Sequence, residues 1–239
     1  MTKAALMFGS IGVLIETSDL QRRAYNQAMS EAGLDWQWDE ETYADLLTQT
    51  GGKERLAHLA AATGADLSQE AIDGIHARKT EISGALMASE GVALRPGVAT
   101  LAWLAKGRGM KLAFVTTTYQ PNIDAVFAAA GDALSPQDFD HIASRDHIAR
   151  GKPAPDAYLA ALEALGVVPQ DALAIEDTSI SVMAAKRAGI EVVATPGAIT
   201  ANQDFWQADL VVSQIGQGAV VDPRVLSMLE GRLHSGGTG

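Results

Sequence analysis

The chain has 239 residues, 47% of them hydrophobic, which is enough to bury a large core as one domain or two small ones. Its 29 acidic side chains outnumber 18 basic ones, which argues against a nucleic-acid partner, and the absence of cysteine excludes disulfides and thiolate chemistry. No apolar run reaches the roughly 18 residues of a membrane span, so we expect a cytoplasmic protein with no membrane partner.

The first third of the chain predicts one short strand followed only by helices. Residues 5–8 form an apolar run typical of a buried strand, and Gly9, Ser10 and Gly12 interrupt it in a way that does not fit a signal peptide. Four helices are expected next, at 16–32, 40–47, 51–62 and 68–86. Ser68 is a suitable N-cap for the last of them. An uninterrupted run of helices predicts an inserted helical domain.

From residue 95 onward, helices and strands alternate. We expect helices at 98–106, 122–130, 156–165 and 179–188, and strands at 111–115, 172–175, 191–194 and 209–212, with a further region around 139–142. Most of these strands are apolar throughout, which predicts a parallel sheet covered on both faces. Ligands of such sheets lie beyond the carboxyl ends of the strands. Gly9, Thr116 and the pair Glu176-Asp177 each follow a strand, so they should converge on one cleft beneath the inserted helices.

Four segments, in this order, resemble the motifs of the haloacid dehalogenase (HAD) superfamily, most closely its CbbY-like and β-phosphoglucomutase-like sugar-phosphate phosphatases. They are Phe-Gly-Ser-Ile-Gly-Val-Leu at 8–14, Thr116 behind an apolar run, Gly-Lys-Pro at 151–153, and Glu176-Asp177. The resemblance extends over nearly the whole chain. It implies an α/β fold: a HAD-like doubly wound parallel sheet core made of residues 1–14 and 92–239, with an α-helical cap domain at 15–91.

The resemblance also implies roles for residues of the core. Thr116 and Thr117 would bind phosphate oxygens, and Lys152 would place its ammonium group against the same phosphate. Asp177 and Glu176 would bind Mg²⁺ or pair with Lys152, because an unpaired carboxylate behind a buried strand is costly.

A second set of basic residues lies in the expected cap. The signature Thr-Gly-Gly-Lys-Glu-Arg at 50–55 resembles the substrate-binding segment of CbbY-like enzymes. It implies that Gly52, Lys53 and Arg55 contact the substrate, and Lys79 resembles a further cap lysine of that family. The start of a helix with free N–H groups also favours anions.

The resemblance fails at the chemical centre. The family opens with Phe-Asp-x-Asp, in which the first aspartate accepts the phosphoryl group and the second is the general acid and base; Gly9 and Ile11 stand there instead. The carboxylate nucleophile divides one difficult step into two, and acid–base help is worth about 10²–10⁴-fold. The first aspartate would also bind Mg²⁺, so the expected Mg²⁺ site is weakened, with Asp177 the one direct carboxylate left.

No other residue is a ready substitute for the missing nucleophile. Ser10 is adjacent, but alternation along an extended segment would turn it away from positions 9 and 11. Glu16 and Asp19 lie on the helix that enters the cap, which is distant from the phosphate site. His141 and His147 are more typical of loop or surface positions.

Three functional hypotheses follow from these observations. The leading one is a catalytically impaired sugar-phosphate phosphatase scaffold that binds phosphate or a small phosphorylated metabolite, with a role in sensing or regulation through a protein partner. The second is residual or unconventional Mg²⁺-dependent hydrolysis of small phosphosugars, by direct attack of water or through an unrecognised group. The third is a non-catalytic interaction scaffold, which a collapsed or blocked cleft would favour.

Overall fold

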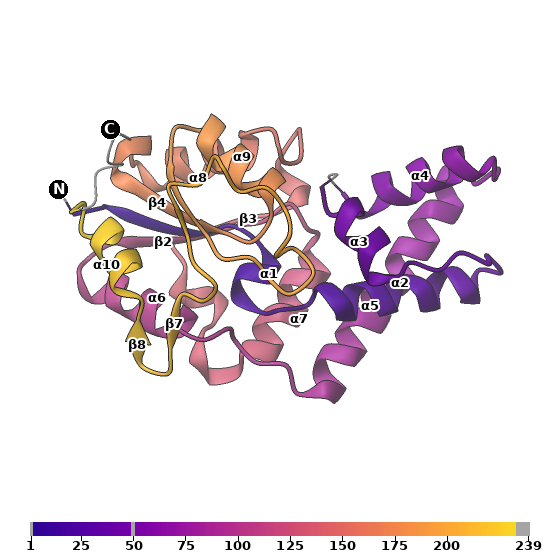
Figure 1. Cartoon of the computed structure of the whole chain (residues 1–239), viewed down its shortest axis with the longest axis horizontal. Helices are drawn as coiled ribbons and strands as arrows, with labels where there is room; N and C mark the ends of the chain where they lie inside the picture. Colours follow the sequence, from indigo (N-terminus) through magenta and orange to yellow (C-terminus); the bar gives the residue numbers. More distant parts are fainter. Residues whose placement is uncertain (1, 49–50, 233–239) are drawn as a thin grey trace.

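A six-stranded parallel sheet covered by helices on both faces forms the larger part of the molecule (Figure 1). The structure is a computed structural model that describes residues 2–48 and 51–232. The strands run in the order β3-β2-β1-β4-β5-β6, so the N-terminal strand lies in the middle of the sheet. Their bounds are β1 Ala5–Phe8, β2 Lys111–Val115, β3 His141–Ala143, β4 Ala172–Glu176, β5 Glu191–Ala194 and β6 Leu210–Val211. The predicted α/β class with a parallel sheet is confirmed.

Both faces of the sheet are buried, which explains why its strands are apolar throughout. Leu6 and Phe8 of β1 pack into the core formed with α1, α6, α7 and α10, whereas Ala5 and Met7 face α8 and α9 on the other side. Each helix layer therefore removes alternate side chains of the same strand from water. The helices are α1 Ile11–Leu14, α6 Val98–Gly107, α7 Gln120–Ala130, α8 Asp156–Leu165, α9 Ser179–Arg187 and α10 Pro223–Leu229.

The register of the central strands aligns their carboxyl ends. Phe8 of β1 pairs with Phe114 of β2 and with Ile175 of β4. Gly9, the next residue after Phe8, is therefore level with the end of both neighbouring strands. The predicted cleft lies at this edge of the sheet.

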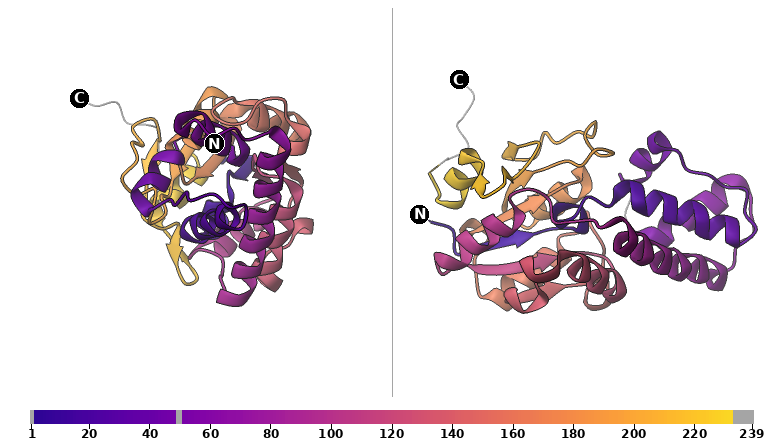
Figure 2. Two further views of the ribbon diagram at one scale, coloured as in Figure 1. Left: turned by 90° about the vertical axis from the view of Figure 1, so that its right-hand side faces the viewer. Right: turned by 90° about the horizontal axis from the view of Figure 1, so that it is seen from below.

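Four helices form a separate bundle at the right of Figure 1, and Figure 2 shows the same separation from two further directions. The bundle has its own aromatic core, in which the ring of Tyr25 lies 4.9 Å from that of Trp38, and Trp38 lies 5.9 Å from Tyr43. The helices are α2 Ser18–Glu31, α3 Glu40–Leu46, α4 Gly52–Thr63 and α5 Gln69–Glu90. The exact division of the chain into 1–14 plus 92–239 and 15–91 stays a prediction.

Several elements differ from the sequence-based expectation. Helix α5 continues four residues beyond 86 and ends at Gly91, whose φ of 63° is in the left-handed region that favours glycine. Helix α10 was not predicted, although Asp222 and Pro223 are typical of a helix start and the Asp222 side chain accepts from Arg224 N. Also unpredicted were α1 and the two-stranded sheet of β7 (Gly216–Gln217) and β8 (Val220–Val221).

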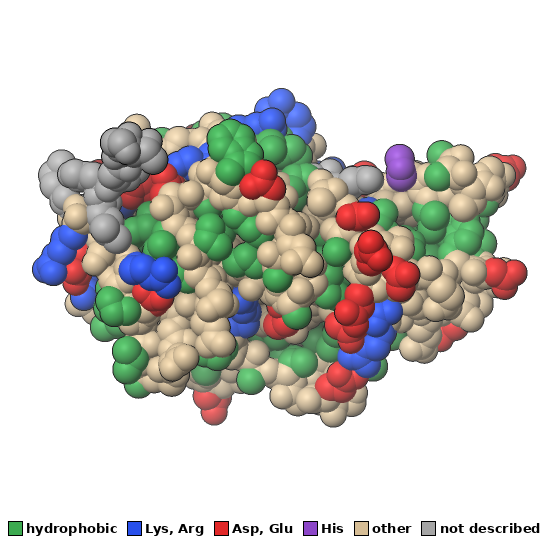
Figure 3. Space-filling view, in the orientation of Figure 1, with side chains coloured by type: hydrophobic (Ala, Val, Ile, Leu, Met, Phe, Trp, Pro, Cys, Tyr) green, Lys and Arg blue, Asp and Glu red, His purple; other side chains and the backbone are tan. Residues whose placement is uncertain are grey.

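Charges of both signs are mixed on one face of the molecule (Figure 3). Figure 3 shows acidic and basic side chains side by side on the same face, without an extended basic area. Within 2–48 and 51–232, no helix combines the length and the apolar character needed to cross a bilayer.

Candidate functional site

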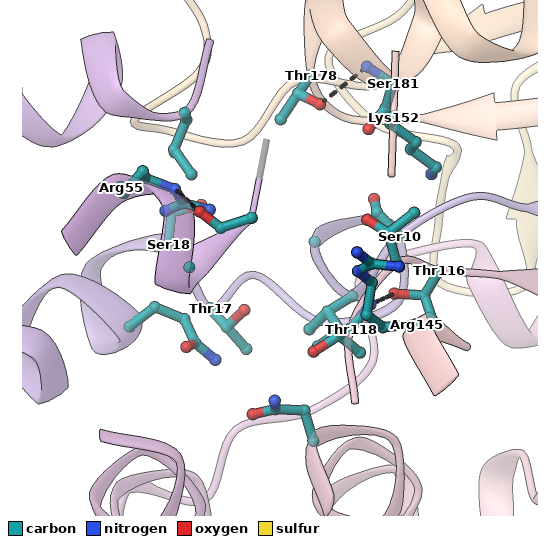
Figure 4. A pocket seen from close by; sticks show the side chains of 18 of the residues that line it. Ser10, Thr17, Ser18, Arg55, Thr116, Thr118, Arg145, Lys152, Thr178 and Ser181 are labelled. Carbon is teal, nitrogen blue, oxygen red and sulfur yellow. Dashed lines mark hydrogen bonds between the residues drawn. The ribbon is translucent and has the colours of Figure 1, made fainter. Parts of the chain in front are cut away.

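A cleft of about 210 Å³ lies where the carboxyl ends of the central strands face the helical bundle (Figure 4). Predicted site residues meet there from both parts of the chain. The core contributes Ile11, Thr116, Thr117, Lys152 and Asp177, and the bundle contributes Gly52, Arg55 and Lys79. The structure thus brings together residues that are distant in the sequence: Ser10 and Asp177, which are 167 positions apart, line the same cavity.

Buried side chains fill the space beside Gly9. Gly9 N donates to Ile175 O at 2.9 Å, which fixes the backbone at the end of β1. A Cβ atom on Gly9 would lie 2.2 Å from Glu176 Cδ and 2.3 Å from the Tyr158 hydroxyl. The volume that a side chain at position 9 would need is therefore occupied by Glu176 and Tyr158.

Glu176 belongs to a buried network behind the wall of the cleft. Its Oε1 accepts from Lys152 Nζ at 2.6 Å and from the Tyr158 hydroxyl at 2.5 Å, and Lys152 Nζ also donates to Gly9 O. Its Oε2 is buried without a hydrogen-bond partner in the described part of the chain. Burial raises the pKa of Glu176 although Lys152 opposes this, and burial also raises the pKa of Tyr158.

Asp177 faces the cleft and binds Ser10. Ser10 Oγ donates to Asp177 Oδ1 at 2.5 Å, and both residues line the cavity. The expectation that Ser10 points away is wrong, because Ser10 is the N-cap of α1 and the extended alternation ends there. Burial raises the pKa of Asp177, against the opposing effect of the Ser10 hydrogen bond. A Cβ on Gly12 would lie 1.8 Å from Asp177 Oδ2, so this close approach requires glycine.

The oxygen atoms at this edge of the sheet do not fit a Mg²⁺ ion. Magnesium takes near-octahedral oxygen ligands, usually one or two carboxylates plus substrate phosphate. Glu176 Oε1 accepts from Lys152 and Tyr158, and the side chain does not line the cleft. Asp177 is therefore the one carboxylate of this edge that faces the cleft, and its Oδ1 accepts from Ser10. Among residues 2–48 and 51–232, no group of three or more His, Cys, Asp or Glu side chains has the arrangement of a metal site.

The predicted phosphate-binding residues lie together on the core side of the cleft. Thr116 is buried and its Oγ1 accepts from Thr118 N at 3.2 Å. Thr117 and Lys152 line the same wall. The orientation of Thr116 leaves its hydroxyl hydrogen free to point toward a ligand.

Sequence reasoning missed two residues of this wall. Asn122, in the first turn of α7, is buried and lines the cleft, and its Oδ1 has no hydrogen-bond partner among the described residues. Arg145 follows β3 and also lines the cleft (Figure 4). The signal for Arg145 was its place just beyond a strand that ends at the same edge of the sheet.

Two of the predicted cap residues face the cleft as cations. Arg55 Nε donates to Gly51 O at 3.2 Å, and its guanidinium lies 5.8 Å from the centre of the Tyr43 ring. Lys79 is 5% exposed, and its Nζ lies 4.8 Å from the centre of the Tyr25 ring. Burial, together with the charge of Arg55, lowers the pKa of Lys79 to about 7.

The other cap positions have different surroundings. Lys53 does not line the cleft; its Nζ pairs with Asp73 at 2.8 Å and lies 5.1 Å from the centre of the Tyr119 ring. Gly52 does line the cleft, and a Cβ there would lie 2.1 Å from the Tyr25 hydroxyl. Thr50 of the predicted cap signature lies outside the described residues.

Comparisons with known proteins agree on one family. The family model of haloacid dehalogenase-like hydrolases matches residues 5–189. Protein CbbY from Cereibacter sphaeroides is 42% identical over 213 residues, which cover 89% of this chain and 93% of that protein.

Solved structures give the same result. The crystal structure of CbbY from Rhodobacter sphaeroides in complex with phosphate aligns with a TM-score of 0.82 at 42% identity, covering 89% of this chain and 94% of that one. A variant of that protein with one aspartate changed to asparagine, in complex with xylulose-(1,5)-bisphosphate, aligns with a TM-score of 0.83 at 41% identity, covering 92% and 99%. β-Phosphoglucomutase from Clostridium difficile shares the fold, with a TM-score of 0.73 at 20% identity.

Proposed function

This chain belongs to the haloacid dehalogenase-like hydrolases, in their CbbY-like group, and from that premise we propose that it binds a phosphorylated sugar in its cleft with little or no turnover. The observation that carries the proposal is a contrast between the residues that line the cleft and the two positions where the family has its aspartates. Residues predicted to bind phosphate line the cleft, whereas Gly9 and Ile11 bring no carboxylate to it. The bound sugar would act as a signal that is passed to a protein partner.

Cations on opposite sides of the cleft support a ligand with two phosphate groups. Lys152 and Thr116 lie on the core side, and Arg55 and Lys79 lie on the cap side. The related CbbY structures contain phosphate and xylulose-(1,5)-bisphosphate, the second of which has a phosphate at each end. That bisphosphate was bound by a variant lacking one aspartate, which supports sugar binding without a full set of carboxylates.

The surroundings of Gly9 support impaired chemistry. An aspartyl-phosphate needs a carboxylate that faces the ligand. The carboxylate nearest to Gly9 is that of Glu176, which is fully buried and bound by Lys152 and Tyr158. Ile11 lines the cleft and has no group that transfers a proton.

The cleft argues against the third hypothesis, a non-catalytic interaction scaffold. That hypothesis expects a collapsed or blocked site. A cavity of about 210 Å³ lined by Arg55, Lys79 and Lys152 instead supports a small anionic ligand.

The proposal is tested by titration calorimetry with xylulose-1,5-bisphosphate and a phosphate-release assay on the same preparation. We expect saturable binding, a raised melting temperature and no release above the rate without protein. A titration that gives no heat, together with an unchanged melting temperature, would count against sugar binding. Sustained release of phosphate at many turnovers per protein molecule would count against impaired chemistry.

The pH dependence of the affinity reports on the cap. Because the pKa of Lys79 is about 7 in the free protein, a bound phosphate raises it and binding takes up a proton above that pH. The affinity should therefore fall as the pH rises above about 7. Lys79→Met should bind more weakly and should lose this part of the dependence, because no lysine is then present to titrate.

One contact favours the second hypothesis, residual phosphatase activity. Ser10 Oγ lies 2.5 Å from Asp177 Oδ1, in the cleft and beside the phosphate-binding wall. In such a reaction Ser10 Oγ would bond to phosphorus as the sugar oxygen leaves. The Ser10 proton would pass to Asp177 and then to the leaving oxygen, and water would hydrolyse the phosphoserine.

If turnover is found, Ser10→Ala should abolish it, with a loss of at least about 10²-fold. Ser18→Ala is the matched control, because Ser18 also lines the cleft but does not contact Asp177. Turnover that is equal in Ser10→Ala and in the unmodified protein would exclude Ser10 as the nucleophile.

A further inference from the structure

The predicted phosphate-binding cation of the core wall is already paired with a carboxylate. Lys152, the predicted phosphate-binding cation, is paired with Glu176 at 2.6 Å and also donates to Gly9 O. Part of its charge is therefore neutralised before a ligand arrives. Glu176 is buried behind the wall and does not line the cleft, and Asp177 Oδ1 accepts from Ser10, so the core wall presents one carboxylate and offers a poor site for a divalent cation.

Arg145 provides a second cation at the same wall. It begins the 3-10 turn Arg145–His147 behind β3, and its backbone N donates to Thr118 O at 2.8 Å. This bond ties the turn to the loop that carries Thr116 and Thr117. Arg145 is half-buried and lines the cleft, and Figure 4 shows its side chain beside Ser10 and Thr116.

The guanidinium group is held in place and still has donors to spare. One terminal nitrogen donates to Ile148 O at 2.8 Å, which fixes the orientation of the group. Within residues 2–48 and 51–232, Arg145 forms no ion pair and its other nitrogens have no acceptor. By contrast, Arg150 on the same segment pairs with Asp156 at 2.8 Å and is 72% exposed.

These observations match the needs of a phosphate group. A guanidinium presents several N–H donors in a plane and binds two oxygens of one phosphate at once. An oriented arginine in a partly buried cleft needs little reordering when the anion binds. Thr116 can contribute a hydroxyl donor from the adjacent loop.

We propose that Arg145 takes the place of the divalent cation, so that this cleft binds the phosphate of its ligand independently of Mg²⁺. The inference rests on the proposed function, since it concerns the same cleft and the same ligand class. It assigns Arg145 as a phosphate-binding residue. Glu176 and Asp177, which accept hydrogen bonds from neighbouring side chains, are then structural groups.

The test is titration calorimetry with inorganic phosphate, in EDTA and in excess Mg²⁺, on the full chain. The unmodified protein should bind with the same affinity in both buffers, within about twofold. Arg145→Gln should weaken binding about 10- to 100-fold in both, as expected for lost charge-assisted hydrogen bonds. Arg150→Gln is the matched control and should bind as the unmodified protein does, because Arg150 does not line the cleft.

Two other results would be decisive in different ways. Binding that strengthens tenfold or more with Mg²⁺, together with unchanged affinity in Arg145→Gln, would overturn this inference and leave the proposed function intact. No binding of phosphate or of xylulose-1,5-bisphosphate in either buffer would overturn the proposed function itself.

Thermal melts establish that Arg145→Gln is folded. Arg145→Lys is the second variant: it keeps the positive charge but loses the planar donor group, so it should weaken binding less than Arg145→Gln does.

Discussion

An aspartate placed at Gly9 is expected to destabilise this protein and not to restore turnover. Its Cβ would lie 2.2 Å from Glu176 Cδ and 2.3 Å from the Tyr158 hydroxyl, and both of these side chains are buried. It would also add a second buried carboxylate beside the single ammonium of Lys152. Overpacking and an uncompensated charge together should lower the free energy of unfolding by about 3 kcal/mol or more, a fall in Tm of roughly 6–12 °C.

Calorimetric melts and a phosphosugar release assay check this expectation, with two further variants. Gly9→Ala introduces only the Cβ and should lose about 1–3 kcal/mol. Gly9→Asp combined with Glu176→Ala removes the clash with Glu176 and one charge but leaves the contact with the Tyr158 hydroxyl, so it should recover part of the stability. If Gly9→Asp alone is as stable as the unmodified protein, Glu176 and Tyr158 move aside easily and the space beside Gly9 is not closed.

Loss of Lys152 is expected to have the second large effect. Lys152→Met removes the ammonium that lies 2.6 Å from Glu176 and leaves a fully buried carboxylate without a counter-charge. Breaking a buried pair in this way typically destabilises a protein by about 3–5 kcal/mol. Chemical denaturation at neutral pH measures the difference. The double variant Lys152→Met/Glu176→Gln should recover most of it, because position 176 then carries no unpaired charge.

The deficit of Lys152→Met should depend on pH in a defined direction. Burial raises the pKa of Glu176, and without Lys152 nothing comparable opposes this. The folded variant therefore holds a proton on Glu176 at a pH where the unfolded chain has released it. Stability gained from that proton is present at low pH and is lost as the pH rises through the folded-state pKa, so the deficit should be smaller at pH 5 than at pH 8.

A surface pair provides the control for this variant. Lys186 pairs with Asp209 at 2.7 Å, and its side chain is 31% exposed. Lys186→Met should change the free energy of unfolding by less than about 1 kcal/mol. A similar small change in Lys152→Met would contradict the buried network described here.

The buried network links the two predictions to the proposed function. Glu176 and Tyr158 fill the space behind Gly9, and Glu176 accepts from both Tyr158 and Lys152, so these two side chains stabilise the core instead of facing a ligand. Several hydrogen-bond donors and cations do face the cleft, among them Thr116, Arg145 and Lys79. This division suits the binding of an anion better than the transfer of its phosphoryl group.

The amino-acid sequence by itself determined most of the main helices and strands and the order of the motifs. Residues 5–8, 156–165 and 191–194 have the predicted bounds, because strongly apolar runs and helical periodicity are local properties. Ser68 could be identified as an N-cap for the same reason, and its side chain accepts from Ala71 N. The parallel sheet then followed, since apolar strands joined by helices have few other arrangements.

Only the tertiary structure decided where the polar side chains point. Ser10 turns toward Asp177 because α1 begins beside it, Lys53 pairs with Asp73 instead of lining the cleft, and Arg145 reaches the cleft through its bond to Thr118. Glu176 fills the space beside Gly9 because Tyr158 and Lys152, from distant parts of the chain, hold it there. Such contacts depend on which groups compete for the same partner and on the space that a missing side chain leaves, and neither is a local property of the sequence.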